Sequence, residues 1–275
     1  MKKPTYFFKK SHFTLLHDRI KTAPKIALFL DFDGTLVPIQ KDPARCFLSE
    51  ETKKQLRSIA GSQNCCLSIL SGRMLSDIKK RVGIHKIYYG GNHGLDISGP
   101  DIRYTHPKAL SAKPVIRDIK HLLQKEIAGI KGAWLEDKKF TLSLHFRSVE
   151  KGDISSVKRA FYKTVDRFIE KKLMAVIKGK KVLELAPYIS WDKGKAALLI
   201  LKAMKDKCFP VYVGDDLTDE TAFSVFSEEG ITIRVGKSMK TLAEFYVKSY
   251  SEVPRILDML AITAQSEGIY EKKSS

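Results

Sequence analysis

The sequence repeats one pattern that narrows the choice of folds: a short, continuously apolar run that ends in a polar turn containing glycine. KIALFL leads into DFDGT, CLSIL leads into SGR, and PVYV leads into GDDLTDE. Runs of this length without polar alternation are typical of strands in a parallel sheet that is covered on both faces. Because ligands bind beyond the carboxyl ends of such strands, we expect the three polar turns to lie at one edge of the sheet.

Helical patterns alternate with these apolar runs. Residues 49–60 begin with Ser49, a good N-cap, and continue with two acidic residues. Residues 191–207 carry an apolar stripe, and residues 218–230 have acidic residues at the front and Gly230 at the end. The alternation of strands and helices predicts an α/β fold with a doubly wound, Rossmann-like parallel sheet.

The chain between the second polar turn and the helical pattern at residues 191–207 is too long for a single crossover. Ser71 and Lys193 are 122 residues apart, whereas a helical crossover needs about a dozen residues or more. The turn-rich stretches SGPD at 98–101 and APY at 186–188 suit domain boundaries. The predicted domains are a core of residues 1–100 and 187–275 and an inserted small α+β cap of residues 101–186.

Within the predicted cap, helical patterns cover residues 112–130 and 154–172, and strand-like patterns cover residues 140–149 and 180–187. The first ~20 residues and the tail YEKKSS are expected to be peripheral.

The 275 residues carry a formal net charge of +18. Such a charge is compatible with a nucleic acid partner, with an anionic small substrate, or with solubility alone. The lysines are spread along the chain, and zinc-finger spacing, an RNP-like motif and a recognition-helix signature are all absent from the sequence. We therefore expect a small anionic substrate and no nucleic acid partner.

The sequence predicts a cytoplasmic protein without a membrane partner. Its apolar runs are far shorter than the ~20 residues of a membrane helix, and MKKPTYFFKK is not followed by an apolar stretch of signal-peptide length. The cysteines, which have no metal-ligand spacing and are expected to be free thiols, are Cys46, Cys65, Cys66 and Cys208. The oligomeric state is left open, and a monomer is compatible with the sequence.

Asp31 and Asp33 lie two residues apart where the first apolar run ends. In an extended segment, residues i and i+2 face the same side, so the two carboxylates can serve one pocket. Adjacent anions are costly unless they share a cation or a proton. Oxygen ligands suit Mg²⁺, and Asp215 and Asp216 in the third polar turn could complete its coordination.

Other residues of the turns suit a phosphate group. Gly34 permits a sharp turn, and Thr35 offers an amide and a hydroxyl. SGR at 71–73 places a hydroxyl and amides at a helix start, and Lys193 adds a positive charge at another. Together these groups predict phosphoryl transfer, in which a metal and the lysine hold phosphate oxygens while a carboxylate attacks in line.

Four stretches in this order, DFDGT, SGR, KG and GDDLTDE, resemble the four motifs of the haloacid dehalogenase superfamily of phosphatases. The predicted insert is similar to the type-2 cap of that superfamily's sugar phosphatases. Within it the chain resembles the trehalose-6-phosphate phosphatase family, through YYGGNHGLDI at 88–97, GAWLEDKKFTLSLHFR at 132–147, ELAPYISWDKGKA at 184–196 and GDDLTDETAF. The resemblance covers roughly residues 25 to 260.

The resemblance implies a role for each matching residue of the core. Asp31 would take the phosphoryl group as an aspartyl-phosphate, and Asp33 would protonate the leaving sugar oxygen and then activate water. Ser71 and Lys193 would grip the phosphate, and Lys193 would also screen Asp31. The residues implied at the Mg²⁺ site, the last two in outer or secondary positions, are Asp31, Asp33 through its backbone carbonyl, Asp215, Asp216 and Asp219. The residues implied elsewhere around the substrate in the core are Thr35, Gly72, Arg73 and His93.

The resemblance also implies that the cap contacts the sugar. The side chains that would face the sugar hydroxyls are Glu136, Lys138 or Lys139, His145, Arg147 and Glu184. The lysine is ambiguous because family members place it two or three positions after the Glu. His145 and Arg147 are predicted to share one face of a strand. Many relatives have Arg at the position of Ala186, so this chain lacks any contact that such an Arg makes.

The function implied by the resemblance is Mg²⁺-dependent hydrolysis of trehalose 6-phosphate to trehalose and phosphate. The alternative is the same chemistry on another sugar phosphate, such as sucrose 6-phosphate or a glycosyl phosphoglycerate. A non-catalytic regulator and a nucleic-acid binder are the competing classes. The first is disfavoured because a binding protein does not need a nucleophile and its acid/base together, and both are intact here as Asp31 and Asp33.

Overall fold

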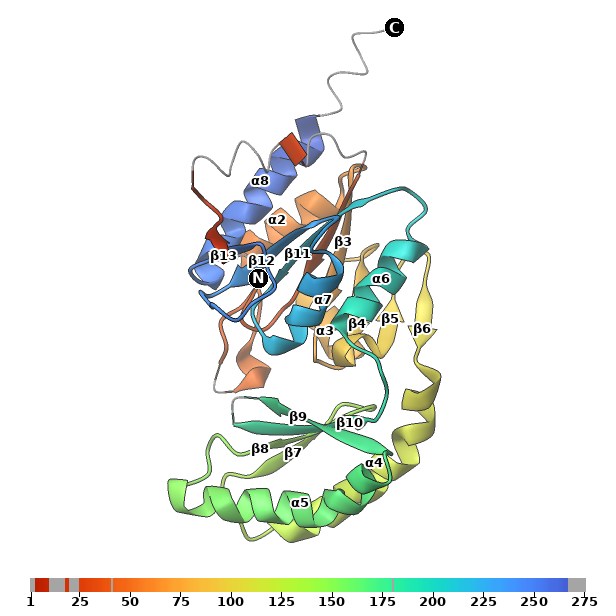
Figure 1. Cartoon of the computed structure of the whole chain (residues 1–275), viewed down its shortest axis with the longest axis vertical. Coiled ribbons are helices and arrows are strands. Elements are labelled where there is room, and N and C mark those ends of the chain that lie inside the picture. The colour runs from red at the N-terminus through yellow and green to blue at the C-terminus, as the bar shows by residue number, and fades with distance from the viewer. Residues whose placement is uncertain (1–2, 10–17, 20–24, 41, 180, 267–275) are drawn as a thin grey trace, which may run out of the picture. The chain divides into compact units, whose positions relative to one another are not determined.

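The computed structural model describes residues 3–9, 18–19, 25–40, 42–179 and 181–266. The chain divides into two compact units (Figure 1): a large unit of Met1–Tyr104 and Trp191–Ser275, and a small unit of Thr105–Ser190. The division falls four residues after each predicted boundary. The described residues include no helix that is long and apolar enough to cross a membrane. All four cysteines are free.

The large unit is built on a mainly parallel sheet, as the sequence predicts. Within the described residues the sheet has nine strands in the order β1-β13-β12-β11-β2-β3-β4-β5-β6. Neighbouring strands from β1 to β4 are parallel, and β5 is antiparallel to β4. The bounds are β1 (Thr5–Tyr6), β2 (Ile26–Leu30), β3 (Cys65–Leu70), β4 (Tyr88–Gly91), β5 (Asp96–Ser98), β6 (Arg103–Thr105), β11 (Phe209–Gly214), β12 (Ile231–Val235) and β13 (Phe245–Val247).

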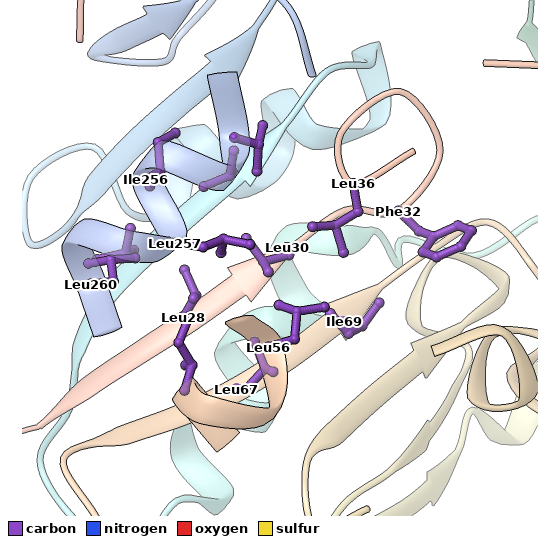
Figure 2. Packing of buried hydrophobic residues seen from close by; sticks show 14 of the residues in the cluster. Leu28, Leu30, Phe32, Leu36, Leu56, Leu67, Ile69, Ile256, Leu257 and Leu260 are labelled. Carbon is purple, nitrogen blue, oxygen red and sulfur yellow. The ribbon is translucent and has the colours of Figure 1, made fainter. Parts of the chain in front are cut away.

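Helices cover both faces of this sheet, which explains why the apolar runs are continuous. Leu28 and Leu30 of β2 pack in one cluster with residues of α2 and α8 (Figure 2). Residues of α3 belong to the same cluster. Ala27 and Phe29, which point to the other face, pack with residues of α6 and α7. Each position of the strand is therefore buried, and none needs a polar side chain. The helices are α2 (Glu50–Ala60), α3 (Leu75–Val82), α6 (Lys193–Ala203), α7 (Glu220–Val225) and α8 (Val253–Ser266).

Two helix predictions for the large unit can be compared with the structure. The cap of α2 is confirmed, because the Ser49 hydroxyl accepts a hydrogen bond from the Thr52 N–H at 3.1 Å. The predicted helix over residues 218–230 is too long: a 3-10 turn covers Leu217–Asp219, and α7 ends at Val225. In this 3-10 turn the Asp219 side chain accepts hydrogen bonds from the backbone N–H groups of Asp215 and Asp216 in the same loop.

The expectation that the first ~20 residues are peripheral is wrong for the segment around β1. Thr5 and Tyr6 pair in parallel with Phe245 and Tyr246 of β13. Phe7 is fully buried in the same apolar cluster as β2. These residues extend the sheet by one strand because they bring an apolar side chain that the cluster buries. The tail YEKKSS lies outside the described residues.

The small unit is an antiparallel sheet with two helices on one face. The sheet has the order β7-β8-β10-β9. Leu142, Leu144, Leu183 and Leu185 point toward α4 and α5 and form an apolar cluster with them. The alternate residues of the same strands therefore form a second, more polar face on the other side. The bounds are α4 (Pro107–Ile127), β7 (Trp134–Asp137), β8 (Leu142–His145), α5 (Ile154–Glu170), β9 (Met174–Gly179) and β10 (Val182–Pro187).

The structure of the small unit corrects three sequence predictions. α4 begins five residues before the predicted start, because Pro107 occupies its first position and the His106 side chain caps it. β7 and β9 were not predicted. β8 ends at His145, since the Val149 N–H donates to the Phe146 carbonyl and the chain turns out of the sheet. Arg147 is exposed in this turn, so the predicted strand face shared by His145 and Arg147 is wrong.

Candidate active site

The three polar turns meet at the carboxyl edge of the large sheet. Asp31 follows β2, Ser71 follows β3, and Asp215 follows β11. Because β11, β2 and β3 are parallel neighbours, these three residues leave the sheet at the same edge. Lys193 is the first residue of α6, whose N-cap Asp192 accepts a hydrogen bond from the Lys195 N–H.

Lys193 joins two of the carboxylates. Its Nζ donates to Asp31 Oδ1 and to Asp219 Oδ1, each at 2.7 Å, and its side chain is only 2% exposed. Burial alone would lower the pKa of Lys193, but the charges of Asp219 and Asp31 outweigh it and raise the pKa above its ordinary value. The lysine is therefore a permanent positive charge inside the site.

Asp219 is held by hydrogen bonds on both of its oxygens. Oδ1 accepts from the Tyr212 hydroxyl at 2.7 Å in addition to Lys193. Oδ2 accepts from the backbone N–H groups of Asp215 at 3.1 Å and Asp216 at 3.0 Å. Asp219 therefore fixes the loop after β11 and orients Lys193. Asp216 itself is exposed and caps the 3-10 turn.

Asp31 and Asp215 offer the oxygens that suit a cation. Ligand oxygens of Asp31, Asp215 and Asp219 all lie within 4.8 Å of one another. Asp31 Oδ2 and Asp215 Oδ1 are buried without a hydrogen-bond partner among the described residues. Burial raises the pKa of Asp31 well above its ordinary value despite Lys193, and burial reinforced by Asp219 raises the pKa of Asp215 to about 7. Buried carboxylate oxygens that lack donors fit a hard divalent cation, which would stabilise their ionised form.

Gly34 brings the backbone of the first turn against Asp215. Its φ is +93°, a conformation that L-residues rarely adopt, and a Cβ at this position would collide with the Asp215 carboxylate. The DFDGT turn and the GDDLTDE turn are therefore in direct contact. Glycine is needed here for both conformation and space.

The side chain of Asp33 forms an ion pair with Arg73. Arg73 Nε donates to Asp33 Oδ2 at 2.7 Å, and Arg73 Nη2 donates to Oδ1 at 2.6 Å. A third guanidinium nitrogen, Nη1, donates to Asp77 Oδ2 at 3.1 Å, and Asp77 also accepts from Arg81. Arg73 from the neighbouring turn therefore pairs with the side chain of Asp33, whereas Lys193 pairs with that of Asp31.

The same arrangement fixes the side chain of Arg73. Its side chain is 8% exposed and engages two carboxylates of the protein. Burial would lower the pKa of Arg73, but the hydrogen bonds and charges of Asp33 and Asp77 raise it instead. A buried guanidinium in a two-pronged pair has a fixed orientation. Arg73 is placed to orient Asp33, and its expected contact with the substrate stays a prediction.

Ser71, Gly72 and His93 form one small structure. The Ser71 hydroxyl accepts from the Arg73 N–H at 3.1 Å, and the Ser71 carbonyl accepts from the His93 N–H at 3.0 Å. The His93 ring lies over Gly72, where a Cβ would come within 2.8 Å of its Cε1. Thr35 is fully buried, and its hydroxyl lacks a partner among the described residues. Hydroxyls of two turns therefore lie at the edge where a phosphate is expected.

A second polar cluster lies on the face of the small sheet that is turned away from α4 and α5. Glu184 Oε2 accepts from Lys138 Nζ at 2.8 Å and from the Ser143 hydroxyl at 3.1 Å. Glu136 Oε2 and His145 Nε2 are 2.8 Å apart, and Lys138 lies 4.0 Å from Glu136. Burial would raise the pKa of Glu136, but the hydrogen bond of His145 and the charge of Lys138 lower it overall. The structure thus groups four residues expected at the sugar with Ser143.

The structure separates the two lysines that the sequence leaves ambiguous. Lys138 joins the polar cluster through Glu184. Lys139 is exposed, has a φ of +74°, and its Nζ lies 4.5 Å from the centroid of the Phe140 ring. Lys138 is therefore the lysine that belongs to the cluster.

Several site residues were missed by sequence reasoning. Tyr212 sits within an apolar strand, where one hydroxyl among valines could have been a signal. Asp77 stands four residues from both Arg73 and Arg81, which is the helical spacing of ion pairs. The sequence around Ser143 did not indicate a site residue, because its hydrogen-bond partner Glu184 lies on another strand.

Comparisons with known proteins agree with this geometry. A family model described as Trehalose-phosphatase matches residues 29–251. The chain is 36% identical over 258 residues to "Probable trehalose-phosphate phosphatase 3" of Oryza sativa subsp. japonica, covering 86% of this chain and 69% of that protein. It is similar to a structure of the C. albicans trehalose-6-phosphate phosphatase C-terminal domain, with a TM-score of 0.78, 21% identity, and coverage of 94% of this chain and 98% of the other. A haloacid dehalogenase-like hydrolase from Bacteroides thetaiotaomicron matches with a TM-score of 0.60, 15% identity, and coverage of 85% and 98%. The two solved structures show a shared fold, and the predicted fold class is confirmed.

Proposed function

This chain belongs to the trehalose-phosphatase family, and we propose that it hydrolyses trehalose 6-phosphate to trehalose and phosphate through an aspartyl-phosphate on Asp31. The observation that carries the proposal is the buried pair of Asp31 and Lys193, 2.7 Å apart, beside Asp215. A carboxylate next to a fixed ammonium group and a cation-binding carboxylate is suited to attack an anionic phosphorus centre.

The proposed cofactor is Mg²⁺. The residues that would hold it are Asp31 and Asp215, whose buried oxygens lack hydrogen-bond donors among the described residues, together with the backbone carbonyl of Asp33. When bound, the cation neutralises charge on the phosphate oxygens and on the two carboxylates. Asp219 would support this site from behind, because its own oxygens are already engaged by Lys193, Tyr212 and the loop amides.

In the proposed first step, a carboxylate oxygen of Asp31 attacks phosphorus, and the bond between phosphorus and the sugar oxygen breaks. Asp33 enters this step protonated and gives its proton to that leaving oxygen, so trehalose departs as the neutral alcohol. In the second step, water attacks the aspartyl-phosphate and returns a proton to Asp33, and phosphate leaves with Asp31 restored. Arg73 holds the Asp33 carboxyl in one orientation for both proton transfers. Lys193, Ser71 and Thr35 hold the phosphate oxygens.

The small unit is proposed to supply the choice of sugar. Glu136, Lys138, His145 and Glu184 carry donors and acceptors that suit hydroxyl groups. Lys138 contacts both Glu184 and Glu136, and His145 contacts Glu136, which links the four side chains into one cluster. Sucrose 6-phosphate and glycosyl phosphoglycerates remain alternative substrates for the same chemistry. We further propose a cytoplasmic location, which four free cysteines support.

The test is phosphate release from a panel of sugar phosphates with purified protein. We expect the highest kcat/KM for trehalose 6-phosphate, loss of activity in EDTA, and recovery when Mg²⁺ is added in excess. A clear preference for sucrose 6-phosphate or a glycosyl phosphoglycerate would replace the substrate and keep the chemistry. Absence of phosphate release from every ester, with Mg²⁺ present, would refute the proposal.

A further inference from the structure

Trp134 stacks on a residue of the polar cluster in the small unit. Trp134 of β7 and His145 of β8 are directly opposite in the antiparallel register. Their ring centroids are 4.1 Å apart and their planes differ by only 10°. The cross-strand pairing brings the two side chains onto the same face of the sheet.

The stack acts on a ring that is also hydrogen-bonded. His145 Nε2 lies 2.8 Å from Glu136 Oε2, and Glu136 is two residues after Trp134 on the same face of β7. An imidazole can rotate about its Cβ–Cγ bond unless its plane is fixed. Because the indole covers one face of the ring, rotation would lose the stacking contact, so the imidazole stays in the plane that reaches Glu136.

Trp134 has little part in the apolar core of its unit. Its side of the sheet is opposite to the one that packs on α4 and α5, and it remains 44% exposed. A tryptophan that keeps so much of its surface in water contributes less to folding than a buried one. The stacking contact with His145 therefore explains the position of Trp134 better than packing in the apolar core does.

We propose that Trp134 is a positioning residue for sugar recognition: it fixes the plane of His145 and thereby the orientation of the Glu136 carboxylate toward a sugar hydroxyl. The inference rests on the proposed function. Hydrogen bonds to carboxylates depend on direction, so a Glu136 that turns with a mobile imidazole binds a hydroxyl less well. Small phosphate esters, which have no sugar hydroxyls, do not depend on this orientation.

The test compares Trp134→Ala and Trp134→Phe with the wild-type protein, and uses Leu110→Ala as a control because Leu110 is an exposed apolar residue of the same unit. Steady-state kinetics are measured on trehalose 6-phosphate and on p-nitrophenyl phosphate. We expect Trp134→Ala to raise KM for trehalose 6-phosphate about five-fold, the scale of one aromatic pair, with a smaller change in kcat. Trp134→Phe should restore most of the loss, because a benzene ring still stacks. Leu110→Ala should match the wild type, as should every variant on p-nitrophenyl phosphate.

A second readout reports on His145 directly. Proton NMR of the imidazole, assigned by its loss in His145→Gln, should show ring-current shifts that disappear in Trp134→Ala and largely persist in Trp134→Phe. If the imidazole signals move but KM for trehalose 6-phosphate does not, or if both substrates lose equally, the proposal is wrong. Wild-type protein that leaves trehalose 6-phosphate intact would instead refute the proposed function, before any variant is compared.

Discussion

The two units of this protein use a sheet in opposite ways to present charged residues. In the large unit the charges stand at the ends of parallel strands, in turns that follow β2, β3 and β11. In the small unit they stand across the face of an antiparallel sheet, on β7, β8 and β10. Ends of parallel strands bring together residues from distant parts of the chain, whereas a sheet face sets side by side the residues of neighbouring strands.

The two arrangements also differ in burial. The side chains of Lys193 and Asp219 are 2% and 0% exposed. In the small unit the exposure ranges from 9% for Glu184 to 31% for Glu136. Charges buried together depend strongly on one another, and removing one leaves its partners unpaired at a high cost. Partly exposed charges are screened by water, so single changes are milder. We therefore expect single substitutions in the large unit to abolish activity. In the small unit we expect them to reduce activity by degrees that depend on the substrate.

The largest expected effect is that of Asp31→Asn. The amide keeps the size of the side chain but is a poor nucleophile, so turnover of trehalose 6-phosphate and of p-nitrophenyl phosphate should each fall by at least about 10⁴-fold. Circular dichroism should confirm that the fold is retained. Normal activity in this variant would rule out the covalent mechanism.

Arg73→Lys should have the next largest effect. A lysine cannot make two parallel bonds to Asp33 and a third to Asp77, so kcat should fall about 10- to 100-fold on both substrates as acid/base catalysis weakens. Arg57→Lys, an exposed change of the same kind on α2, should behave as wild type. A loss confined to KM for the sugar phosphate would return Arg73 to the substrate-binding role that its motif suggested.

Glu184→Ala should impair hydrolysis of trehalose 6-phosphate much more than hydrolysis of p-nitrophenyl phosphate. Removing this carboxylate leaves Lys138 and Ser143 without the acceptor they share, so kcat/KM for trehalose 6-phosphate should fall about 10-fold or more. p-Nitrophenyl phosphate should be hydrolysed almost as before. The control is Glu170→Ala, an exposed glutamate at the end of α5. Equal losses on both substrates would remove the small unit from substrate choice.

The smallest expected effect is a pH-dependent change in stability at Glu136. The pKa of Glu136 is lowered in the folded protein, where burial is outweighed by His145 and Lys138. The resulting stabilisation is present above the ordinary glutamate pKa of 4.5 and is lost as the pH falls through the lowered value. Glu136→Gln should therefore melt a few degrees below wild type at pH 7. A gap between the two melting temperatures that stays constant down to pH 3 would contradict this assignment.

Much of the large unit could be predicted because its signals are local. A continuous apolar run followed by a polar turn identifies a buried parallel strand, and parallel strands place their turns at one edge. Asp31, Ser71, Lys193 and Asp215 followed from that rule and from the motif resemblance. The strand β1 did not, because two residues of edge pairing leave almost no periodicity in the sequence.

The small unit was predicted less completely because its strands are short and its partners are remote. β7 spans four residues, Trp134–Asp137, and is too short to show an alternation. The sequence predicted a strand over residues 140–149. β8 ends at His145 because a turn follows, in which the Val149 N–H donates to the Phe146 carbonyl. The sequence did not reveal that Lys138 pairs with Glu184, because the two residues are 46 positions apart in the chain.

The sequence by itself determined the layered α/β fold, the position of the insert, and the carboxylates and lysine at the sheet edge, because apolar periodicity and turn chemistry act over a few residues. Only the tertiary structure decided which cation each carboxylate receives. Arg73 pairs with Asp33 across 40 residues, and Lys193 bridges Asp31 and Asp219. Such choices depend on distances of a few ångströms between strands that are far apart in the chain, and no local pattern encodes them.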